Sequence, residues 1–196
     1  MDRFLFGPLG VGLALFLALI LGVGSALWMI GRVFSSPIRN GPWQYNPLIG
    51  SQAAGAYLRA TIARIGLLAL SKAEAIYLIA NRDSDGRPLS GDASYRVEGV
   101  DVASRWWSIT AYGADSFLIP NSLERYSYSS RSVQRSPDGS YCIQVASTEK
   151  SHNWLPVQPG QPFDLMIRLY NPSPSVLENL GEIPLPRIIR ETSSHA

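Results

Sequence analysis

The sequence carries little charge. Lys, Arg, Asp and Glu make up 16% of its 196 residues, against about 25% in an average soluble protein. Lys and Arg number 17, Asp and Glu number 15, and from Asn40 onward the two signs balance at fourteen each. A neutral domain without a basic stripe gains no affinity from phosphate contacts, so we expect no nucleic-acid partner.

Metal-ligating residues are equally scarce. The chain has one cysteine, Cys142, and two widely separated histidines, His152 and His195. A single cysteine excludes an intrachain disulfide framework, and these three residues are too few for a zinc site of ordinary spacing. We therefore expect no metal and no cofactor.

Recognisable catalytic motifs are missing as well. The sequence contains no G-x-S-x-G, H-E-x-x-H, Walker or dinucleotide-binding fingerprint. Asp83, Asp85 and Asp92 stand in a glycine-bearing loop but lack the ligand pattern of a calcium loop. We expect a solvated turn there.

A long uncharged run is the strongest positive feature. The 28 residues between Arg3 and Arg32 are rich in Leu, Ala, Val and Phe, and a helix of about 20 such residues crosses a bilayer. A cleaved signal peptide is the alternative, because Gly24–Ala26 offers small residues before a cut. The run exceeds the usual apolar region of a signal peptide, about 7 to 15 residues. We predict a retained transmembrane anchor over residues 1–34.

Small residues recur at every fourth position of this predicted helix: Gly10, Ala14, Ala18, Gly22 and Ala26. They form one ridge along the helix, and such ridges let a second helix approach closely within lipid. We predict that this ridge contacts a membrane protein partner or a second copy of the chain. The bilayer itself is the other expected partner.

Turn-forming residues separate the anchor from the rest of the chain. Residues 35–46 contain two prolines and an Asn-Gly pair and are expected to be a linker. Residues 47–190 are one domain's worth of chain. Residues 191–196 are polar and are expected to be a flexible tail.

The folded part changes its hydrophobic period along the chain. Helical spacing predicts one amphipathic helix within residues 47–71, whereas later segments alternate with period two. The predicted strands are Ala75–Ala80, Ser94–Val100, Arg105–Tyr112, Glu124–Val133, Tyr141–Ser147 and Phe163–Tyr170. A short helix is expected near Val176–Leu180. The fold class is mainly β with α (α+β): a transmembrane helix, then an antiparallel β-sandwich or jelly-roll-like domain with one amphipathic helix.

Aromatic and polar residues cluster in the strand region. The candidate ligand-binding residues are Trp106, Tyr112, Asn121, Arg125, Tyr126, Asn153 and Trp154. Alternation places Trp106, Ser108, Thr110 and Tyr112 on one face of a strand. If that face is open, its rings and hydrogen-bonding groups would hold a sugar or a polar lipid. The alternative is that the Trp and Tyr residues fill a two-sheet core, while Arg and Asn side chains bond strand ends and loops.

Acid–base chemistry would need a paired or pKa-shifted carboxylate or histidine in a pocket. Asp115, Glu124 and His152 are the candidates near the aromatic strands. No residue pattern identifies a reaction for them, so the catalytic residues stay unknown.

These strands also carry a family resemblance. The ordered series Glu74–Tyr77, Asp83–Gly91, Trp107–Thr110, Asn153–Pro156 and Arg168–Tyr170 resembles the bacterial domain of unknown function numbered twelve-fourteen. The resemblance implies a jelly-roll-like β domain, commonly the C-terminal half of larger exported proteins, and supplies no reaction. The uncharged run predicts a single-pass protein of the bacterial inner membrane. The flanking charges do not decide its orientation, so the expected periplasmic location of the domain rests on the resemblance to exported proteins.

These features predict a noncatalytic accessory or scaffold subunit of a membrane protein complex. A lone membrane helix cannot by itself form a channel or transporter, and the small-residue ridge suits a helix partner. The alternative is a protein that binds or modifies an envelope glycan or lipid, such as a hydrolase.

Overall fold

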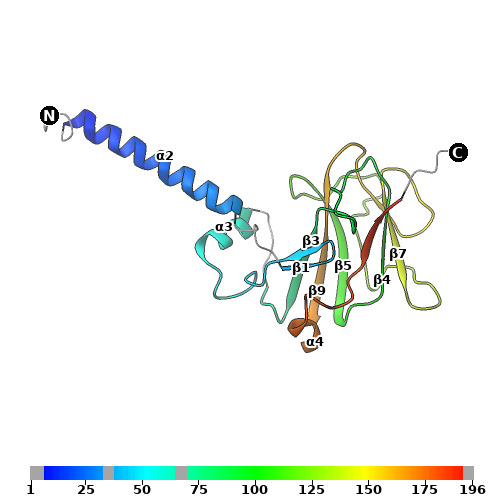
Figure 1. The fold of residues 1–196 in the computed structure, drawn as a ribbon. Helices are drawn as coiled ribbons and strands as arrows, with labels where there is room; N and C mark the ends of the chain where they lie inside the picture. Colours follow the sequence, from blue (N-terminus) through cyan, green and yellow to red (C-terminus); the bar gives the residue numbers. More distant parts are fainter. Residues whose placement is uncertain (1–6, 33–37, 65–69, 192–196) are drawn as a thin grey trace. The chain divides into compact units, whose positions relative to one another are not determined.

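The computed structural model describes residues 7–32, 38–64 and 70–191. The chain divides into two compact units. Helices α2 (Pro8–Arg32) and α3 (Ala56–Arg64) belong to the first unit. All the strands belong to the second unit, which is a β-sandwich (Figure 1).

Helix α2 is the candidate membrane span. Among the described residues it is the one helix long and apolar enough to cross a bilayer, over Pro8–Met29, and none of that stretch is buried. Pro8 stands at its first position, where a missing N–H costs nothing. Residues 1–6, 33 and 34 of the predicted anchor lie outside the described residues. An N-terminal helix of this kind is typical of a membrane anchor or of a signal sequence.

Helix α3 is shorter than the predicted segment 47–71. It begins after Gly55 and buries Leu58 and Thr61, which belong to the expected apolar stripe. Residues 46–49 form a turn instead of helix, and Gly50 follows it with a φ of +74°. A Cβ at Gly50 would lie 2.1 Å from the carbonyl oxygen of Leu70, so only glycine fits there.

The sandwich consists of two sheets. The six-stranded sheet has the order β1 (Ile38–Asn40), β2 (Trp43–Tyr45), β3 (Ala75–Ala80), β9 (Phe163–Pro172), β5 (Ser104–Gly113) and β6 (Ser127–Ser129). The four-stranded sheet has the order β10 (Arg187–Arg190), β4 (Tyr95–Gly99), β7 (Tyr141–Ala146) and β8 (Trp154–Pro156). Only the named pair β7 and β8 runs parallel. In Figure 1, β3, β9 and β5 lie side by side, and β4 and β7 form the other layer. The predicted mainly β, antiparallel fold class is confirmed.

Four strands lie outside the predicted set. The expected linker 35–46 contains β1 and β2, which pair antiparallel across a two-residue loop that starts with Gly41. Gly41 has a φ of +58°, as the first loop residue of a II′ hairpin requires. Strands β8 and β10 have three and four residues, too few for a clear period of two. The expected short helix is present as α4 (Pro174–Glu178).

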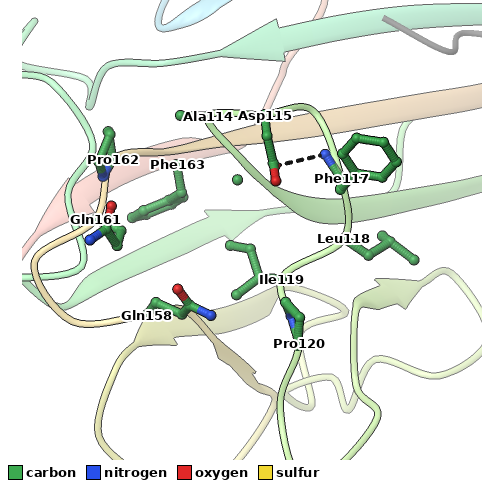
Figure 2. A pocket seen from close by; sticks show the side chains of 11 residues that line it. Ala114, Asp115, Phe117, Leu118, Ile119, Pro120, Gln158, Gln161, Pro162 and Phe163 are labelled. Atoms are coloured by element: carbon green, nitrogen blue, oxygen red, sulfur yellow. Dashed lines mark hydrogen bonds between the residues drawn. The ribbon is translucent and has the colours of Figure 1, made fainter.

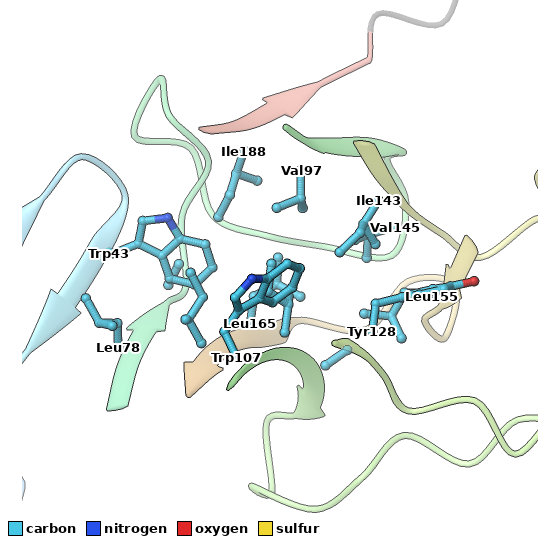
Figure 3. Packing of buried hydrophobic residues seen from close by; sticks show 14 of the residues in the cluster. Trp43, Leu78, Val97, Trp107, Tyr128, Ile143, Val145, Leu155, Leu165 and Ile188 are labelled. Atoms are coloured by element: carbon cyan, nitrogen blue, oxygen red, sulfur yellow. The ribbon is translucent and has the colours of Figure 1, made fainter. Parts of the chain in front are cut away.

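The hydrophobic core lies between the two sheets (Figure 3). From Phe163 to Tyr170 the buried residues of β9 are Phe163, Leu165, Ile167 and Leu169, which confirms the predicted alternation. They face buried side chains of the other sheet, such as Val97, Ile143, Leu155 and Ile188. On β5 the core side chains are Trp107, Ile109 and Ala111, and Trp107 is 2% exposed. Its neighbour Trp106 lies on the opposite face of the strand.

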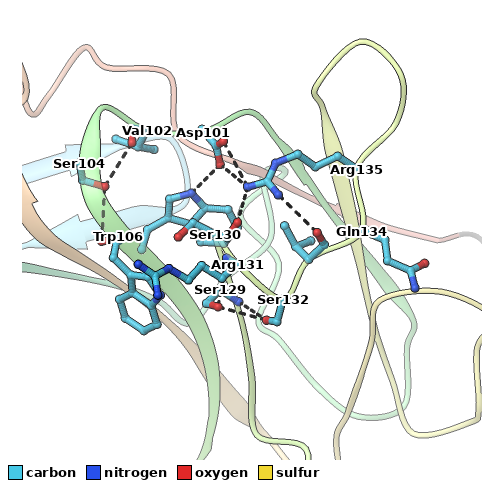
Figure 4. Close-up of polar contacts among 12 residues, drawn as sticks. Asp101, Val102, Ser104, Trp106, Ser129, Ser130, Arg131, Ser132, Gln134 and Arg135 are labelled. Carbon is cyan, nitrogen blue, oxygen red and sulfur yellow. Dashed lines mark hydrogen bonds and ion pairs between the residues drawn. The ribbon is translucent and has the colours of Figure 1, made fainter.

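A polar cluster holds the indole of Trp107 in place (Figure 4). Trp107 Nε1 donates a hydrogen bond to Asp101 Oδ1 at 2.7 Å. Arg135 Nη2 donates to the same carboxylate at 2.9 Å and to the Ser130 carbonyl at 2.7 Å. Burial alone would raise the pKa of Asp101, but the hydrogen bonds from Arg135 and Trp107 outweigh it and lower this pKa. The cluster therefore keeps a charged carboxylate at the edge of the core.

The acidic turn at residues 83–88 is only partly solvated, unlike the prediction. The side chain of Asp83 is fully buried, whereas that of Asp85 is exposed. Asp83 Oδ1 accepts the backbone N–H groups of Asp85 and Arg87, at 3.0 and 2.9 Å. Asp83 Oδ2 lies 3.3 Å from Nε of Arg87 and 3.4 Å from Nε of Arg190. The burial of Asp83 could not be predicted from the sequence, because its partner Arg190 lies on β10, over a hundred residues away.

Candidate functional site

The six-stranded sheet presents an unusual face on the side away from the core, which we call the outer face. Its residues alternate with the core residues of β3, β9 and β5. They are Tyr77, Ile79, Trp106, Ser108, Thr110, Tyr112, Asp164, Met166, Arg168 and Tyr170. The set contains four aromatic rings and no Lys or Glu. A solvated sheet face would instead carry mainly small polar and charged side chains.

Arg168 is the centre of the outer face. Its Nη1 donates to Thr110 Oγ1 at 3.1 Å, its Nη2 donates to the Tyr112 hydroxyl, and its guanidinium lies 5.4 Å from the centroid of the Tyr112 ring. Next to it, the rings of Trp106 and Tyr170 meet edge to face at 5.3 Å. Thr110 is buried beneath these larger side chains. These contacts fix the orientation of the large side chains on the outer face.

Asp164 stands opposite Tyr112 on the neighbouring strand. Burial raises the pKa of this carboxyl group, because a charged carboxylate loses favourable hydration. The outer face therefore contains one carboxyl group whose ionisation opposes folding.

Replacing Asp164 with asparagine is expected to raise the melting temperature of the sandwich at pH 7 by a few degrees. A carboxyl group whose pKa is raised on folding stabilises the fold below its unfolded pKa of about 4 and loses that contribution as pH rises through its folded pKa. The gap between variant and wild type should therefore close as the pH is lowered toward 4. Thermal unfolding followed by circular dichroism measures it, with exposed Glu124→Gln as the control. A gap that widens on acidification would contradict the assignment.

The predicted ligand-binding residues divide between separate places. Trp106 and Tyr112 lie on the outer face. Asn121 and Arg125 lie in the loop that connects β5 to β6, where Asn121 Nδ2 donates to the Arg125 carbonyl at 3.0 Å. Arg125 in turn donates to the Trp154 carbonyl at 3.3 Å. These contacts join a loop of the first sheet to β8 of the second.

The remaining predicted residues brace the backbone. Asn153 is buried with a φ of +42°, accepts the Gln134 N–H at 2.8 Å, and donates to the carbonyls of Gln134 and Cys142. The indole N–H of Trp154 donates to the Ala146 carbonyl at 2.9 Å. The carbonyl of Tyr126 accepts the N–H of Ala111 at 3.2 Å. These polar groups bond strand ends and loops, as the core-filling alternative anticipates.

A pocket of about 260 Å³ lies beyond the ends of β5 and β9 (Figure 2). One wall is the turn that follows β5, and the other is the loop that precedes β9. Its lining residues are Gly113, Ala114, Asp115, Phe117, Leu118, Ile119, Pro120, Gln158, Gln161, Pro162 and Phe163. Sequence reasoning missed all of them except Asp115, because they are loop residues without a motif.

The three acid–base candidates are all exposed. Asp115 lines the pocket, and its Oδ1 accepts the N–H of Phe117 at 3.0 Å. Glu124 and His152 do not line this pocket. The described residues also contain no group of three or more His, Cys, Asp and Glu side chains placed to hold a metal ion.

Most of the small residues of the α2 ridge are exposed in the described part of the chain. Ala14, Ala18 and Gly22 are exposed, and Gly10 and Ala26 are half-buried. A Cβ built at Gly22 would meet no heavy atom within 4 Å. Extra bulk at this position would therefore clash with nothing in the described part of the chain.

The chain is similar to one protein family and to two solved structures of uncharacterised proteins. Residues 74–174 match the family described as protein of unknown function (DUF1214). The VPA0106 protein of Vibrio parahaemolyticus has a similar structure, with a TM-score of 0.59 and 27% identity, over 95% of this chain and 46% of that chain. A putative uncharacterized protein from Burkholderia cenocepacia has a TM-score of 0.50 and 13% identity, over 87% of this chain and 41% of that chain.

The chain thus spans less than half the length of either solved structure. No curated protein matches the sequence. The matched family segment covers more than half of the chain and includes strands β3 to β9. The chain therefore belongs to the family of proteins of unknown function DUF1214.

Proposed function

We propose that this protein is a membrane-anchored, noncatalytic accessory subunit of a membrane protein complex, with its β domain on the periplasmic side of the bacterial inner membrane. Helix α2 would anchor the chain and contact a partner helix. The outer face of the sandwich would dock on the water-exposed part of the same partner.

The composition of the outer face is the observation that supports this proposal best. Aromatic residues, Met and Arg are enriched in protein interfaces, whereas Lys and Glu are depleted. Trp, Tyr and Arg are also the usual residues of interface hot spots. The outer face combines Trp106, Tyr170, Tyr112, Arg168 and Met166 on neighbouring strands. Such a surface suits a large partner better than a small substrate.

The arrangement of Arg168 favours binding over catalysis. Its guanidinium is engaged by Thr110 and Tyr112, so it orients rings instead of presenting a reactive group. The rings of Trp106 and Tyr170 are half-buried and held against each other. Surfaces fixed in this way lose little side-chain entropy when a partner binds.

The ridge on α2 supports a partner within the membrane. Helix association in lipid depends on close van der Waals contact, which small residues permit. Residues spaced by four follow a row that is inclined to the helix axis. A partner helix that follows this row would cross α2 in the right-handed manner of small-xxx-small pairs, at about −40°.

The proposal predicts a stoichiometric partner whose binding depends on both surfaces. The full chain is purified from membranes in mild detergent, and its partners are identified by mass spectrometry. Gly22→Leu and Ala18→Leu should each lower recovery of the partner at least fivefold, because bulk on the ridge separates the helices. Trp106→Ala should lower it as well. Val23→Leu, which adds bulk beside the ridge, and Leu123→Ala, on an exposed loop, are the matched controls.

Three outcomes would contradict the proposal. The first is a chain that runs as a monomer without a stoichiometric partner. The second is a partner retained at wild-type levels by all three variants. The third is recovery of a mature chain that lacks α2, which would identify that helix as a cleaved signal sequence.

A further inference from the structure

We propose that the pocket between the turn 113–120 and the loop 158–163 binds one ring of an uncharged sugar. This site is separate from the outer face, and the inference does not depend on the accessory role. It rests on the construction of the pocket walls, the polar groups that they carry, and the size of the space.

The first wall is a tight turn that fixes Asp115. The Gly113 N–H donates to the Phe117 carbonyl at 2.9 Å, and the Ser116 N–H donates to the Gly113 carbonyl at 2.9 Å. A Cβ at Gly113 would lie 2.8 Å from Asp115 Oδ1, so glycine leaves room for the carboxylate. Asp115 Oδ1 accepts the Phe117 N–H. This carboxylate makes no other hydrogen bond or ion pair within the described part of the chain, so its second oxygen is available to a ligand.

The second wall is held by a neighbouring loop. The Gly91 N–H donates to the Gln161 carbonyl at 2.9 Å, and Ser90 forms a bridge with Pro162. A Cβ at Gly91 would lie 1.8 Å from the Gln158 carbonyl oxygen, so the two backbones are in direct contact. This bracing fixes the backbone from which the Gln158 and Gln161 side chains extend beside the hollow (Figure 2).

The polar groups define the chemistry of the ligand. Asp115 supplies acceptor oxygens, and the carboxamides of Gln158 and Gln161 each supply a donor and an acceptor. Hydroxyl groups are donors and acceptors at once, so a polyol can satisfy all three side chains. The lining contains no Lys, Arg or His. An anionic group such as phosphate would find no positive partner and would be repelled by Asp115.

The apolar lining residues and the volume of the pocket further limit which ligands can fit. Ile119 and Phe163 are lining residues that are themselves buried, whereas Phe117 and Leu118, which also line the pocket, are 73% and 43% exposed. Such surfaces contact the C–H face of a sugar ring. About 260 Å³ is below the range of about 300–1,000 Å³ that holds drug-sized ligands. The space suits one ring, alone or at the end of a longer glycan, and is too small for a lipid tail.

The test uses the full chain in a detergent without a sugar headgroup. Saturation-transfer NMR is recorded with D-glucose, D-galactose, D-mannose and N-acetyl-D-glucosamine, and with inorganic phosphate and tetramethylammonium as charged probes. We expect saturable binding of at least one sugar and of neither ion. Asp115→Asn keeps the acceptor oxygen of the turn but loses the charge, and should weaken binding of that sugar at least tenfold. Phe117→Ala should weaken it about threefold or more.

Asp138→Asn is the matched control, because Asp138 is also exposed and its Oδ1 accepts the N–H two residues later, at Ser140. This variant should bind like the wild type. The exposed ring of Phe117 makes Phe117→Ala safe for folding. The proposal is overturned if no sugar binds at millimolar concentration, if phosphate or tetramethylammonium binds in preference, or if Asp115→Asn and Phe117→Ala both bind like the control.

Discussion

Replacing Asp83 with alanine is expected to destabilise the sandwich by about 3–5 kcal/mol, the cost of removing one partner from a buried ion pair. The substitution leaves the guanidinium of Arg190 beside an empty space and removes the acceptor of two backbone N–H groups. Arg190 also donates to the Pro88 carbonyl and to the Tyr95 hydroxyl, at 2.8 and 2.9 Å. The loss would thus loosen β10, the acidic turn and β4 together.

Denaturant unfolding of the full chain in detergent, followed by tryptophan fluorescence, measures this loss. Asp83→Asn keeps the acceptor oxygen and removes only the charge, so its cost should be smaller than that of alanine. Asp85→Ala is the control, because the Asp85 side chain is 66% exposed, and it should change the free energy of unfolding by less than about 0.5 kcal/mol. Equal effects at the two positions would show that the buried pairing is unimportant.

Replacing Trp107 with alanine is expected to lower the free energy of unfolding by a similar amount, about 3–5 kcal/mol. The indole is 2% exposed and packs on the ring of Tyr141, with 4.7 Å between centroids. Its removal leaves a cavity between the sheets and takes a hydrogen bond from Asp101. Trp107→Phe keeps most of the packing and loses the indole N–H, so its cost should lie well below that of alanine.

Trp106→Ala is the matched comparison, since the two tryptophans are neighbours on β5 and face opposite ways. Trp106 is half-buried on the outer face and contacts Tyr170, so its loss should cost less than half as much as that of Trp107. Both variants are compared by the same unfolding measurement. If Trp106→Ala proved as destabilising as Trp107→Ala, the outer face would serve the chain's own stability, and its proposed role in docking would fail.

The long strands of the fold were predictable, and the short ones were not. Strand β9 alternates apolar and other residues from Phe163 to Tyr170, so its period identifies it and its buried side. Strands β1, β2, β8 and β10 have three or four residues, over which no period can be read. Their pairing depends on partners far away in the sequence. The turn residues before β2 indicated a chain reversal but not the hairpin around it.

The candidate sites were predictable only where they lie on a strand. Alternation placed Trp106 and Tyr112 on the same side of β5, and both lie on the outer face. Gln158 and Phe117 carry no such signal, because a pocket between two loops forms from tertiary contacts alone. The burial of Asp83 was hidden for a similar reason, since its partner Arg190 lies on β10. Asn153 resembled a ligand residue in sequence, yet its hydrogen bonds all go to the backbone.

The order of strands in the sheets also determines when the domain can close during its synthesis. Strand β3 pairs with β9, and β4 pairs with β10, so neither sheet can be complete until the last strands are available for pairing. Pairing between segments so far apart in sequence has to overcome a large loop-closure entropy and is slow. Until then the apolar sides of β3 and β5 have no partner and are prone to aggregation. A chain in this interval exposes extended apolar segments of the kind that chaperones bind.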